Sequence, residues 1–197
     1  MVRSAAKGGA MERVLILTGD AGEELEVYYM LYRLREAGYA VDVAASERRR
    51  LQLVVHDFEP GWDTYVERPG RGLDADLAFS DVEPERYAAL LIPGGRAPEV
   101  IRNDTDVQRI VAHFFDHGLP VGHMCHGVQV PAAAGYVRGR RVAAYPPLAP
   151  DIEAAGGEFV DGADVVDGAM VSARGWEDLA DFFRAFLELL ERKAVPA

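Results

Sequence analysis

The stretch that decides the fold is residues 119–128, which read LPVGHMCHGV. A short apolar run stops at Cys125, the single cysteine of the chain, and a histidine and a glycine follow before an alanine-rich segment that is typical of a helix. This order predicts a nucleophile on a sharp turn from a strand into a helix. Gly127, two residues after the cysteine, stands where a side chain would crowd such a turn.

The position of Cys125 at a helix start favours a reactive thiol. Unpaired backbone N–H groups and the helix dipole stabilise negative charge there, and the thiolate is the reactive form of cysteine. His123, two residues before the cysteine, stands where an elbow of this kind prefers a small residue, so the match is partial. The alternative is a small buried cysteine that packs under a helix, and the flanking sequence favours the reactive site.

Composition restricts the classes of protein and partner. The chain has 197 residues, 49% of them hydrophobic, and a net charge of −11. We expect residues 1–11 to be a disordered extension and residues 12–193 to form a single domain with a substantial core. The negative charge argues against nucleic acid or a membrane as the main partner, and no apolar run approaches the roughly 20 residues that span a bilayer. A lone cysteine forms no internal disulfide, which fits the cytoplasm.

The order of apolar runs and helical periodicity predicts an α/β fold. We expect strands at 14–17, 39–44, 87–92 and 119–124, helices at 23–37, 98–116 and 176–192, and an irregular region at 46–86. Near the end we expect a short helix at 150–155 and strands at 158–160, 164–166 and 170–173, with a hairpin turn at Asp167 and Gly168. Alternation of strands and helices predicts a mostly parallel sheet with helices on both faces.

Three strand ends carry the residues that suggest chemistry: 19–26, 93–95 and 125–127. Ligands bind at the carboxyl ends of the strands in open sheets of this kind. Residues 93–95 read PGG, so their backbone approaches a substrate without interference from side chains. Together with the amide of His126, Gly94 and Gly95 would form an oxyanion hole, although Pro-Gly-Gly alone is a common turn.

Two acids follow the first strand. Glu26 lies between apolar neighbours on its helix, and desolvation would raise its pKa, so that a protonated carboxyl could donate a hydrogen bond to a thiolate. Glu23 lies one turn earlier. The alternative for both is an acid that stabilises the helix N-terminus, which fits Glu23 better than Glu26.

This combination of motifs resembles the ThiJ/PfpI superfamily, also called DJ-one/PfpI. The matching segments are 14–18, 23–26 (EELE), 91–99 (LIPGGRAPE), 125–127 (CHG), 139–141 (GRR) and 144–146 (AYP). The resemblance covers nearly all of residues 12–192. It implies a three-layer, flavodoxin-like α/β sandwich of the class I glutamine amidotransferase type.

The resemblance also implies roles for individual residues. Cys125 would be the nucleophile, Glu26 the acid that hydrogen-bonds it, and His126 the base. Glu99 would reach His126 of a neighbouring chain, so the site would be complete only in a dimer or a hexamer. The segment 56–65 is similar to an insertion in relatives with glyoxalase III activity, which makes His56 and Tyr65 candidates for lining the pocket. Packing within the loop is an equally weighted alternative for both residues.

Two departures from the family pattern are visible: Val128 stands where a proline often follows Cys-His-Gly, and His123 replaces a small residue. A metal site is not expected. His113 and His117 share a helix face, but the ligand count is low and there is no second cysteine. We likewise expect no cofactor.

Three functions remain open from the sequence. The first is a glyoxalase III or deglycase, in which Cys125 attacks the aldehyde carbon of methylglyoxal and the product is lactate. The second is a PfpI-type intracellular cysteine peptidase that uses Cys125, His126 and Glu99 of a neighbour. The third is a stress protein or chaperone that senses oxidation at Cys125.

Overall fold

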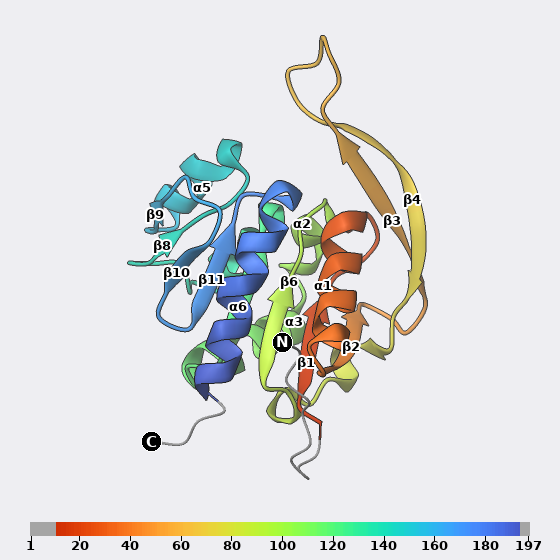
Figure 1. The fold of residues 1–197 in the computed structure, drawn as a ribbon, viewed down its shortest axis with the longest axis vertical. Helices are drawn as coiled ribbons and strands as arrows, with labels where there is room; N and C mark the ends of the chain where they lie inside the picture. The colour runs from red at the N-terminus through yellow and green to blue at the C-terminus, as the bar shows by residue number, and fades with distance from the viewer. Residues whose placement is uncertain (1–10, 194–197) are drawn as a thin grey trace.

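The computed structural model describes residues 11–193, and Figure 1 shows how its elements are arranged. The strands are β1 (Arg13–Leu17), β2 (Ala40–Ala45), β3 (Arg50–Asp57), β4 (Val66–Asp74), β5 (Leu77–Ala78), β6 (Ala89–Ile92), β7 (Val121–Met124), β8 (Arg141–Val142), β9 (Glu158–Phe159), β10 (Val165–Asp167) and β11 (Met170–Ala173). The α-helices are α1 (Glu24–Glu36), α2 (Ala97–Ile101), α3 (Thr105–Asp116), α4 (Gln129–Ala133), α5 (Ala149–Ala154) and α6 (Leu179–Lys193). Short 3-10 turns include η3 (Cys125–Val128) and η5 (Trp176–Asp178). The predicted extension lies outside the described residues except for Met11.

The central sheet has the order β10-β11-β7-β6-β1-β2-β5, and its pairs are parallel except for β10 with β11. The predicted α/β fold with a mostly parallel sheet is therefore confirmed. The predicted hairpin turn is also present, because β10 and β11 are antiparallel and Gly168 has a φ of +61°. That left-handed conformation carries little penalty for glycine.

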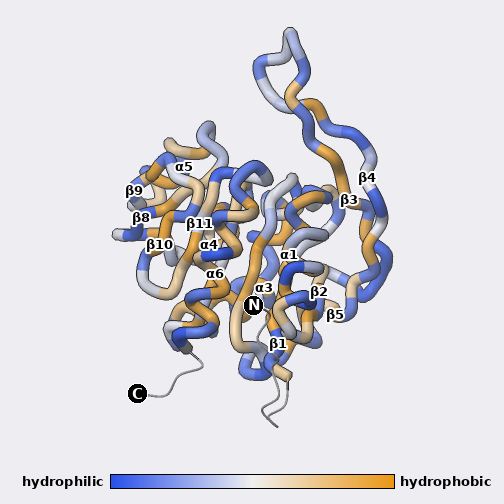
Figure 2. Tube along the Cα trace, viewed as in Figure 1, coloured by the Kyte–Doolittle hydropathy of each residue, from blue (hydrophilic) through white to orange (hydrophobic). Residues whose placement is uncertain are grey.

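Two apolar layers cover the sheet. Alternate strand residues point to opposite faces, so Ile16 packs with α1 and α6, while Leu15 packs with α3 on the other face. Figure 1 shows α1 and α6 in front of the sheet with α3 behind it, and in Figure 2 the strands between them are strongly hydrophobic. The sheet is thereby buried on both faces. Ligands can therefore approach it only at the ends of its strands.

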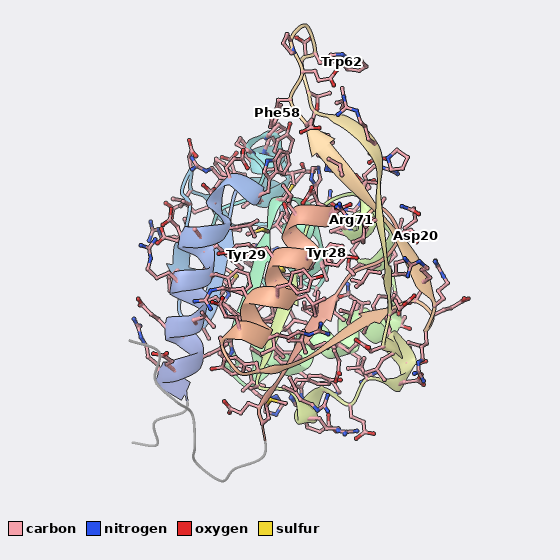
Figure 3. The ribbon with its side chains drawn as sticks, turned by 45° about the vertical axis from the view of Figure 1, so that its right-hand side comes forward. Asp20, Tyr28, Tyr29, Phe58, Trp62 and Arg71 are labelled. Carbon is pink, nitrogen blue, oxygen red and sulfur yellow. The ribbon has the colours of Figure 1, made fainter. Side chains whose placement is uncertain are left out.

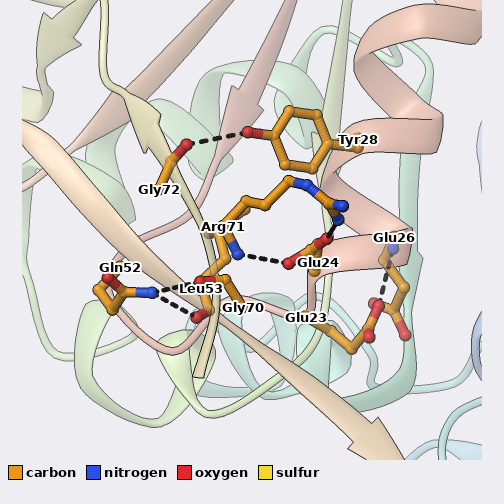
Figure 4. Close-up of polar contacts among 9 residues, drawn as sticks. All are labelled: Glu23, Glu24, Glu26, Tyr28, Gln52, Leu53, Gly70, Arg71 and Gly72. Atoms are coloured by element: carbon orange, nitrogen blue, oxygen red, sulfur yellow. Dashed lines mark hydrogen bonds and ion pairs between the residues drawn. The ribbon is translucent and has the colours of Figure 1, made fainter. Parts of the chain in front are cut away.

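The sequence predicted an irregular region at 46–86, and this prediction is wrong. The region contains a long antiparallel hairpin, β3–β4. Its sequence does not alternate cleanly, because β4 contains Pro69, Gly70 and Gly72 and the register shifts between Gln52 and Val54. Gly70 is required where the hairpin meets the start of α1, since a Cβ there would stand 2.4 Å from Oε2 of Glu24. In Figure 4, the side chain of Glu24, the first residue of α1, points toward the hairpin and accepts hydrogen bonds from the amide and the guanidinium of Arg71.

The hairpin extends beyond the body of the molecule. In Figure 3, Trp62 lies at its tip, while Phe58 lies closer to the body of the molecule, where its ring is 5.7 Å from that of Trp176; both side chains are more than half exposed. A second correction concerns the helix predicted at 98–116, which is divided into α2 and α3. Asp104 ends the first part, because its side chain accepts hydrogen bonds from the amides of Asp106 and Val107 and caps α3. Within residues 11–193, no helix is both long enough and apolar enough to span a bilayer.

Candidate active site

The three strand ends meet because β7, β6 and β1 are neighbours in the sheet. The loop after β1 pairs with the loop after β6 through a bridge between Gly22 and Gly95, and the amide of Glu23 donates to the carbonyl of Gly94 at 3.2 Å. The turn after β7 carries Cys125 to the same edge. The segments 19–26, 93–95 and 125–127 thus form one site.

Cys125 has the backbone of a nucleophile elbow. Its φ is +53°, a left-handed conformation that costs energy for a residue with a Cβ and that clusters at functional sites. Gly127 is needed for the turn, because a Cβ there would stand 2.2 Å from the carbonyl oxygen of Ile92. The turn forms with His123 two residues before the cysteine, and the His123 side chain is fully buried.

The sulfur of Cys125 lies among backbone N–H donors and the imidazole of His126. Nδ1 of His126 lies 3.3 Å from Sγ, and the backbone N–H groups of His126 and Gly95 also donate to the sulfur. The amide of Gly94 instead donates to Oε2 of Glu26. Of the amides predicted for an oxyanion hole, those of Gly95 and His126 therefore face the sulfur, and that of Gly94 is already bonded.

The two acids of α1 are both buried. Burial raises the pKa of Glu26 to about 8, and the charge of Glu23 adds to the increase. Burial also raises the pKa of Glu23 to about 7. Figure 4 shows the Glu23 side chain accepting from the backbone amide of Glu26, at 2.8 Å, so Glu23 also caps the helix, as the alternative interpretation held. At neutral pH, Glu26 is mostly a neutral carboxylic acid that can donate a proton or a hydrogen bond.

The charge state of the thiol differs from the helix-dipole expectation. Burial raises the pKa of Cys125 above its ordinary value, and negative charge on Glu26 adds to this, while the two backbone N–H groups act in the opposite direction. The resting site is thus a thiol beside a carboxylic acid. Burial likewise lowers the pKa of His126 to about 4, so its imidazole is neutral and can accept the proton of the thiol.

Tyr65 and His56, the candidates from the hairpin, lie beside His126. The ring of Tyr65 is 6.2 Å from that of His126 and 4.2 Å from that of His56. His56 is buried, and its Nε2 lies 3.1 Å from Oε2 of Glu67. Glu67 in turn accepts two hydrogen bonds from Arg96, which lowers the pKa of this carboxyl to about 2. The hairpin is therefore fixed to the loop that follows Gly95.

Among the described residues, no hydrogen bond or ion pair joins the Glu99 side chain to Cys125 or His126. Glu99 is exposed on α2, and its charge contributes to the pKa of Tyr65, which burial raises to about 12. In the described part of the chain, no group of three or more His, Cys, Asp and Glu side chains is placed to hold a metal ion.

Cys125 opens onto a cavity of about 400 Å³. Its lining consists of Phe58, Cys125, Tyr145, Pro146, Pro147, Asp161, Arg174, Gly175, Trp176 and Glu177. Sequence reasoning missed the segment 174–177. Its only signal was the polar sequence RGWE directly after a predicted strand, at the same sheet edge as the other three segments.

Comparisons with known proteins agree with this arrangement. Residues 12–189 match the model of the DJ-1/PfpI family. A deglycase of Thermococcus kodakarensis is 36% identical over 178 residues, which cover 90% of this chain and 99% of the relative. A deglycase of Pyrococcus horikoshii is 38% identical over 179 residues, covering 91% of this chain and 99% of the relative.

A solved structure supports the fold. The crystal structure of a ThiJ/PfpI domain protein from Brachyspira murdochii superposes with a TM-score of 0.79 at 20% identity, over 93% of this chain and 99% of the other. With the family match across most of the chain and relatives of similar length, the conclusion is direct: this chain belongs to the DJ-1/PfpI family.

Proposed function

We propose that this protein is a cofactor-independent cysteine enzyme of the glyoxalase III or deglycase type, which acts in the cytoplasm on reactive aldehydes and their adducts. The observation that carries the proposal is the elbow at Cys125, with a neutral imidazole 3.3 Å from the sulfur and a protonated acid on the other side. The deglycase relatives support the same chemistry.

The reaction would begin with transfer of the thiol proton to His126 and attack of the sulfur on the aldehyde carbon of methylglyoxal. The hemithioacetal oxygen would lie near the backbone amides of Gly95 and His126. Glu26 or His126 would then move a proton between the two carbons, which turns the hemithioacetal into a hydroxyacyl thioester. Water would hydrolyse the thioester to lactate and restore the thiol.

The test is formation of lactate from methylglyoxal without any added thiol. We expect wild-type protein to produce lactate and Cys125→Ala to produce none, because the protein supplies the sulfur. Cys125→Ser replaces the thiol with a hydroxyl and keeps a similar volume, so it controls for loss of packing. Full activity in Cys125→Ala would exclude the proposal.

A peptidase is the second candidate, and the exposed position of Glu99 favours it. Glu99 is exposed on the surface of α2, so its carboxylate is available to orient His126 of another copy. This candidate therefore requires a homo-oligomer, a dimer or a hexamer, with Glu99 acting across the interface.

Mixed oligomers test the role of Glu99 across subunits. Glu99→Ala and Cys125→Ala would each be inactive alone, and exchange of their subunits would restore activity, because the Cys125→Ala chain supplies Glu99 to an intact thiol. A monomer in sedimentation experiments would count strongly against the peptidase. Stable sulfinic acid at Cys125, with no turnover of methylglyoxal or peptides, would instead favour an oxidation sensor.

A further inference from the structure

The imidazole of His126 is oriented by aromatic rings of its own chain. Its Nδ1 atom lies 3.3 Å from Sγ of Cys125, and no other hydrogen bond joins its ring nitrogens to a described residue. A catalytic histidine needs a fixed orientation, because the accepting nitrogen must stay within reach of the thiol proton. In a Ser-His-Asp triad, a carboxylate supplies that orientation. Here the rings of Tyr65 and Tyr145 contact the imidazole.

Tyr145 is tied to the elbow itself. Its ring stacks on that of His126 with centroids 5.3 Å apart and planes 28° apart. The backbone N–H of Tyr145 donates to the carbonyl of Cys125 at 3.4 Å, so this ring and the elbow form one unit. A stacked neighbour restrains the tilt of the imidazole, but it restrains movement within the plane of the stack only weakly.

Tyr65 comes from the hairpin and stands at a right angle to His126. The two ring centroids lie 6.2 Å apart with an interplanar angle of 90°, which is a favoured aromatic geometry. The ring of Tyr65 is also only 5.5 Å from that of Tyr145, so the two tyrosines contact the imidazole from neighbouring directions and not from opposite faces. Tyr65 therefore blocks a movement of the imidazole that the stack with Tyr145 permits.

Contacts within the hairpin hold Tyr65 in turn. Its ring lies 4.2 Å from that of the buried His56, whose Nε2 lies 3.1 Å from Oε2 of Glu67. Glu67 accepts from Nε and Nη2 of Arg96 at 2.7 and 2.6 Å. Because Arg96 directly precedes α2, a chain of contacts runs from the loop after β6 through the hairpin to His126.

The position of Tyr65 separates it from the substrate cavity. Neither Tyr65 nor His56 is among the described residues that line the cavity at Cys125. The Tyr65 hydroxyl forms no hydrogen bond with a described residue, which leaves the ring as the part that acts. Burial lowers the pKa of His126 to about 4, with the charge of His56 acting in the same direction and that of Asp151 in the opposite one. The Tyr65 ring contributes to that burial.

We propose that Tyr65 is a positioning residue for His126, because its ring holds Nδ1 of the imidazole toward the sulfur. The contacts of His56 and Glu67 hold that ring in place. The inference rests on the proposed function for the step in which His126 takes the thiol proton. It adds that the hairpin β3–β4 supplies the orientation of the base, which a carboxylate supplies in a triad.

Two variants and a control test the ring of Tyr65. Tyr65→Leu removes the ring and Tyr65→Phe keeps it. Tyr136→Leu is the matched control, because the Tyr136 ring stacks on Phe115 with centroids 4.6 Å apart, beyond the end of α4. With methylglyoxal, Tyr65→Leu should lower kcat roughly tenfold and leave KM nearly unchanged, because the base is misplaced while the cavity is intact. Tyr65→Phe and Tyr136→Leu should keep the wild-type kcat.

Two further measurements need no turnover. The imidazole pKa of His126, followed by carbon-13 NMR and assigned by the signal lost in His126→Gln, should rise by about one unit in Tyr65→Leu, because water then reaches the ring. It should stay at the wild-type value in Tyr65→Phe, and a purely structural loss of packing would not move it. Alkylation of Cys125 by iodoacetamide at neutral pH should slow roughly tenfold in Tyr65→Leu alone.

The double variant that combines Tyr65→Leu with Glu67→Ala tests the chain of contacts. Glu67 acts through Tyr65, so the double variant should be no slower than Tyr65→Leu, whereas additive losses would show an independent role for Glu67 and overturn that part of the proposal.

An unchanged kcat and imidazole pKa in Tyr65→Leu would overturn the proposal. A Tyr65→Phe variant as slow as Tyr65→Leu would also overturn it, since the hydroxyl and not the ring would then be the active part. This failure is distinct from failure of the proposed function. Lactate formation that Tyr65→Leu does not alter would retain the enzyme assignment and lose the inference, and a raised imidazole pKa in Tyr65→Leu of a protein that forms no lactate would do the reverse.

Discussion

Glu26 and Cys125 face each other across Gly94. A Cβ atom on Gly94 would stand 2.5 Å from Cβ of Cys125 and 2.9 Å from Oε2 of Glu26, so no larger residue fits between the acid and the thiol. The amide of Gly94 also donates to Glu26 and thereby orients its carboxyl group. A single glycine in the loop after β6 therefore sets the geometry of the acid and the nucleophile.

The first prediction concerns this contact. Gly94→Ala should slow alkylation of Cys125 by iodoacetamide at least tenfold, because the new methyl pushes the thiol and the acid apart. We expect a cost in stability of about 1–3 kcal/mol, as for other overpacked sites. Gly19→Ala is the matched control, since its Cβ would meet nothing closer than 3.5 Å. Equal alkylation rates in the two variants would contradict the proposed contact.

The second prediction concerns stability at alkaline pH. The pKa of Glu26 is raised by folding, from 4.5 to about 8, so the neutral acid stabilises the native state fully below pH 4.5, and this contribution is lost as the pH rises through 8. Glu26→Gln removes the titration but retains an acceptor for Gly94. The free energy of unfolding, measured with urea from pH 5 to 9, should fall less steeply in the variant.

Between pH 5 and pH 9, the free energy of unfolding should fall by a few kcal/mol more in the wild type than in Glu26→Gln, because each pKa unit is worth about 1.4 kcal/mol. A smaller slope should remain in the variant, since Glu23 titrates near 7. If the two curves stay parallel across this range, Glu26 is not a neutral acid in the native protein.

The third prediction concerns acid. His123 is fully buried, neither ring nitrogen has a hydrogen-bond partner among the described residues, and burial lowers its pKa to about 3. Its neutral form therefore contributes stability above pH 6.5, and the contribution is lost as the pH falls toward 3. His123→Leu, which has a similar volume, should lower the pH at which the protein unfolds, as measured by circular dichroism.

The control for this experiment is His117→Leu, because His117 is exposed at the end of α3. Only the His123 variant should resist acid. An unchanged midpoint of acid unfolding in His123→Leu would show that another group controls the transition.

The fourth prediction concerns the hairpin. Glu67 links β4 to Arg96 and to His56, so Glu67→Ala should accelerate hydrogen exchange of the backbone amides of β3 and β4 and lower catalytic efficiency. The pair is partly exposed, and the global unfolding temperature should change little. Asp57→Ala removes an ion pair with Arg68 nearer the tip and is the control. Equal exchange in both variants would mean that Glu67 does not hold the hairpin in place.

Local patterns were enough for much of the fold. The apolar runs that became β1, β6 and β7 are short and nearly uninterrupted, which is the pattern of strands buried on both faces. The positions of Cys125 and Gly127 predicted the elbow, because the steric demands of a sharp turn act between neighbours in sequence. The hairpin β3–β4 could not be predicted in the same way. Its register and its glycines depend on contacts with α1 and not on a regular alternation of apolar and polar residues.

The sequence by itself determined that the chain would bring Cys125, Glu26 and residues 93–95 to one edge of a parallel sheet. Only the tertiary structure decided that Glu67 would bind Arg96, and that Glu177 would line the cavity at Cys125. The physical reason is that burial and through-space charge depend on which distant segments pack together. These two quantities set the pKa of each group at Cys125, and neither is encoded in the spacing of residues along the chain.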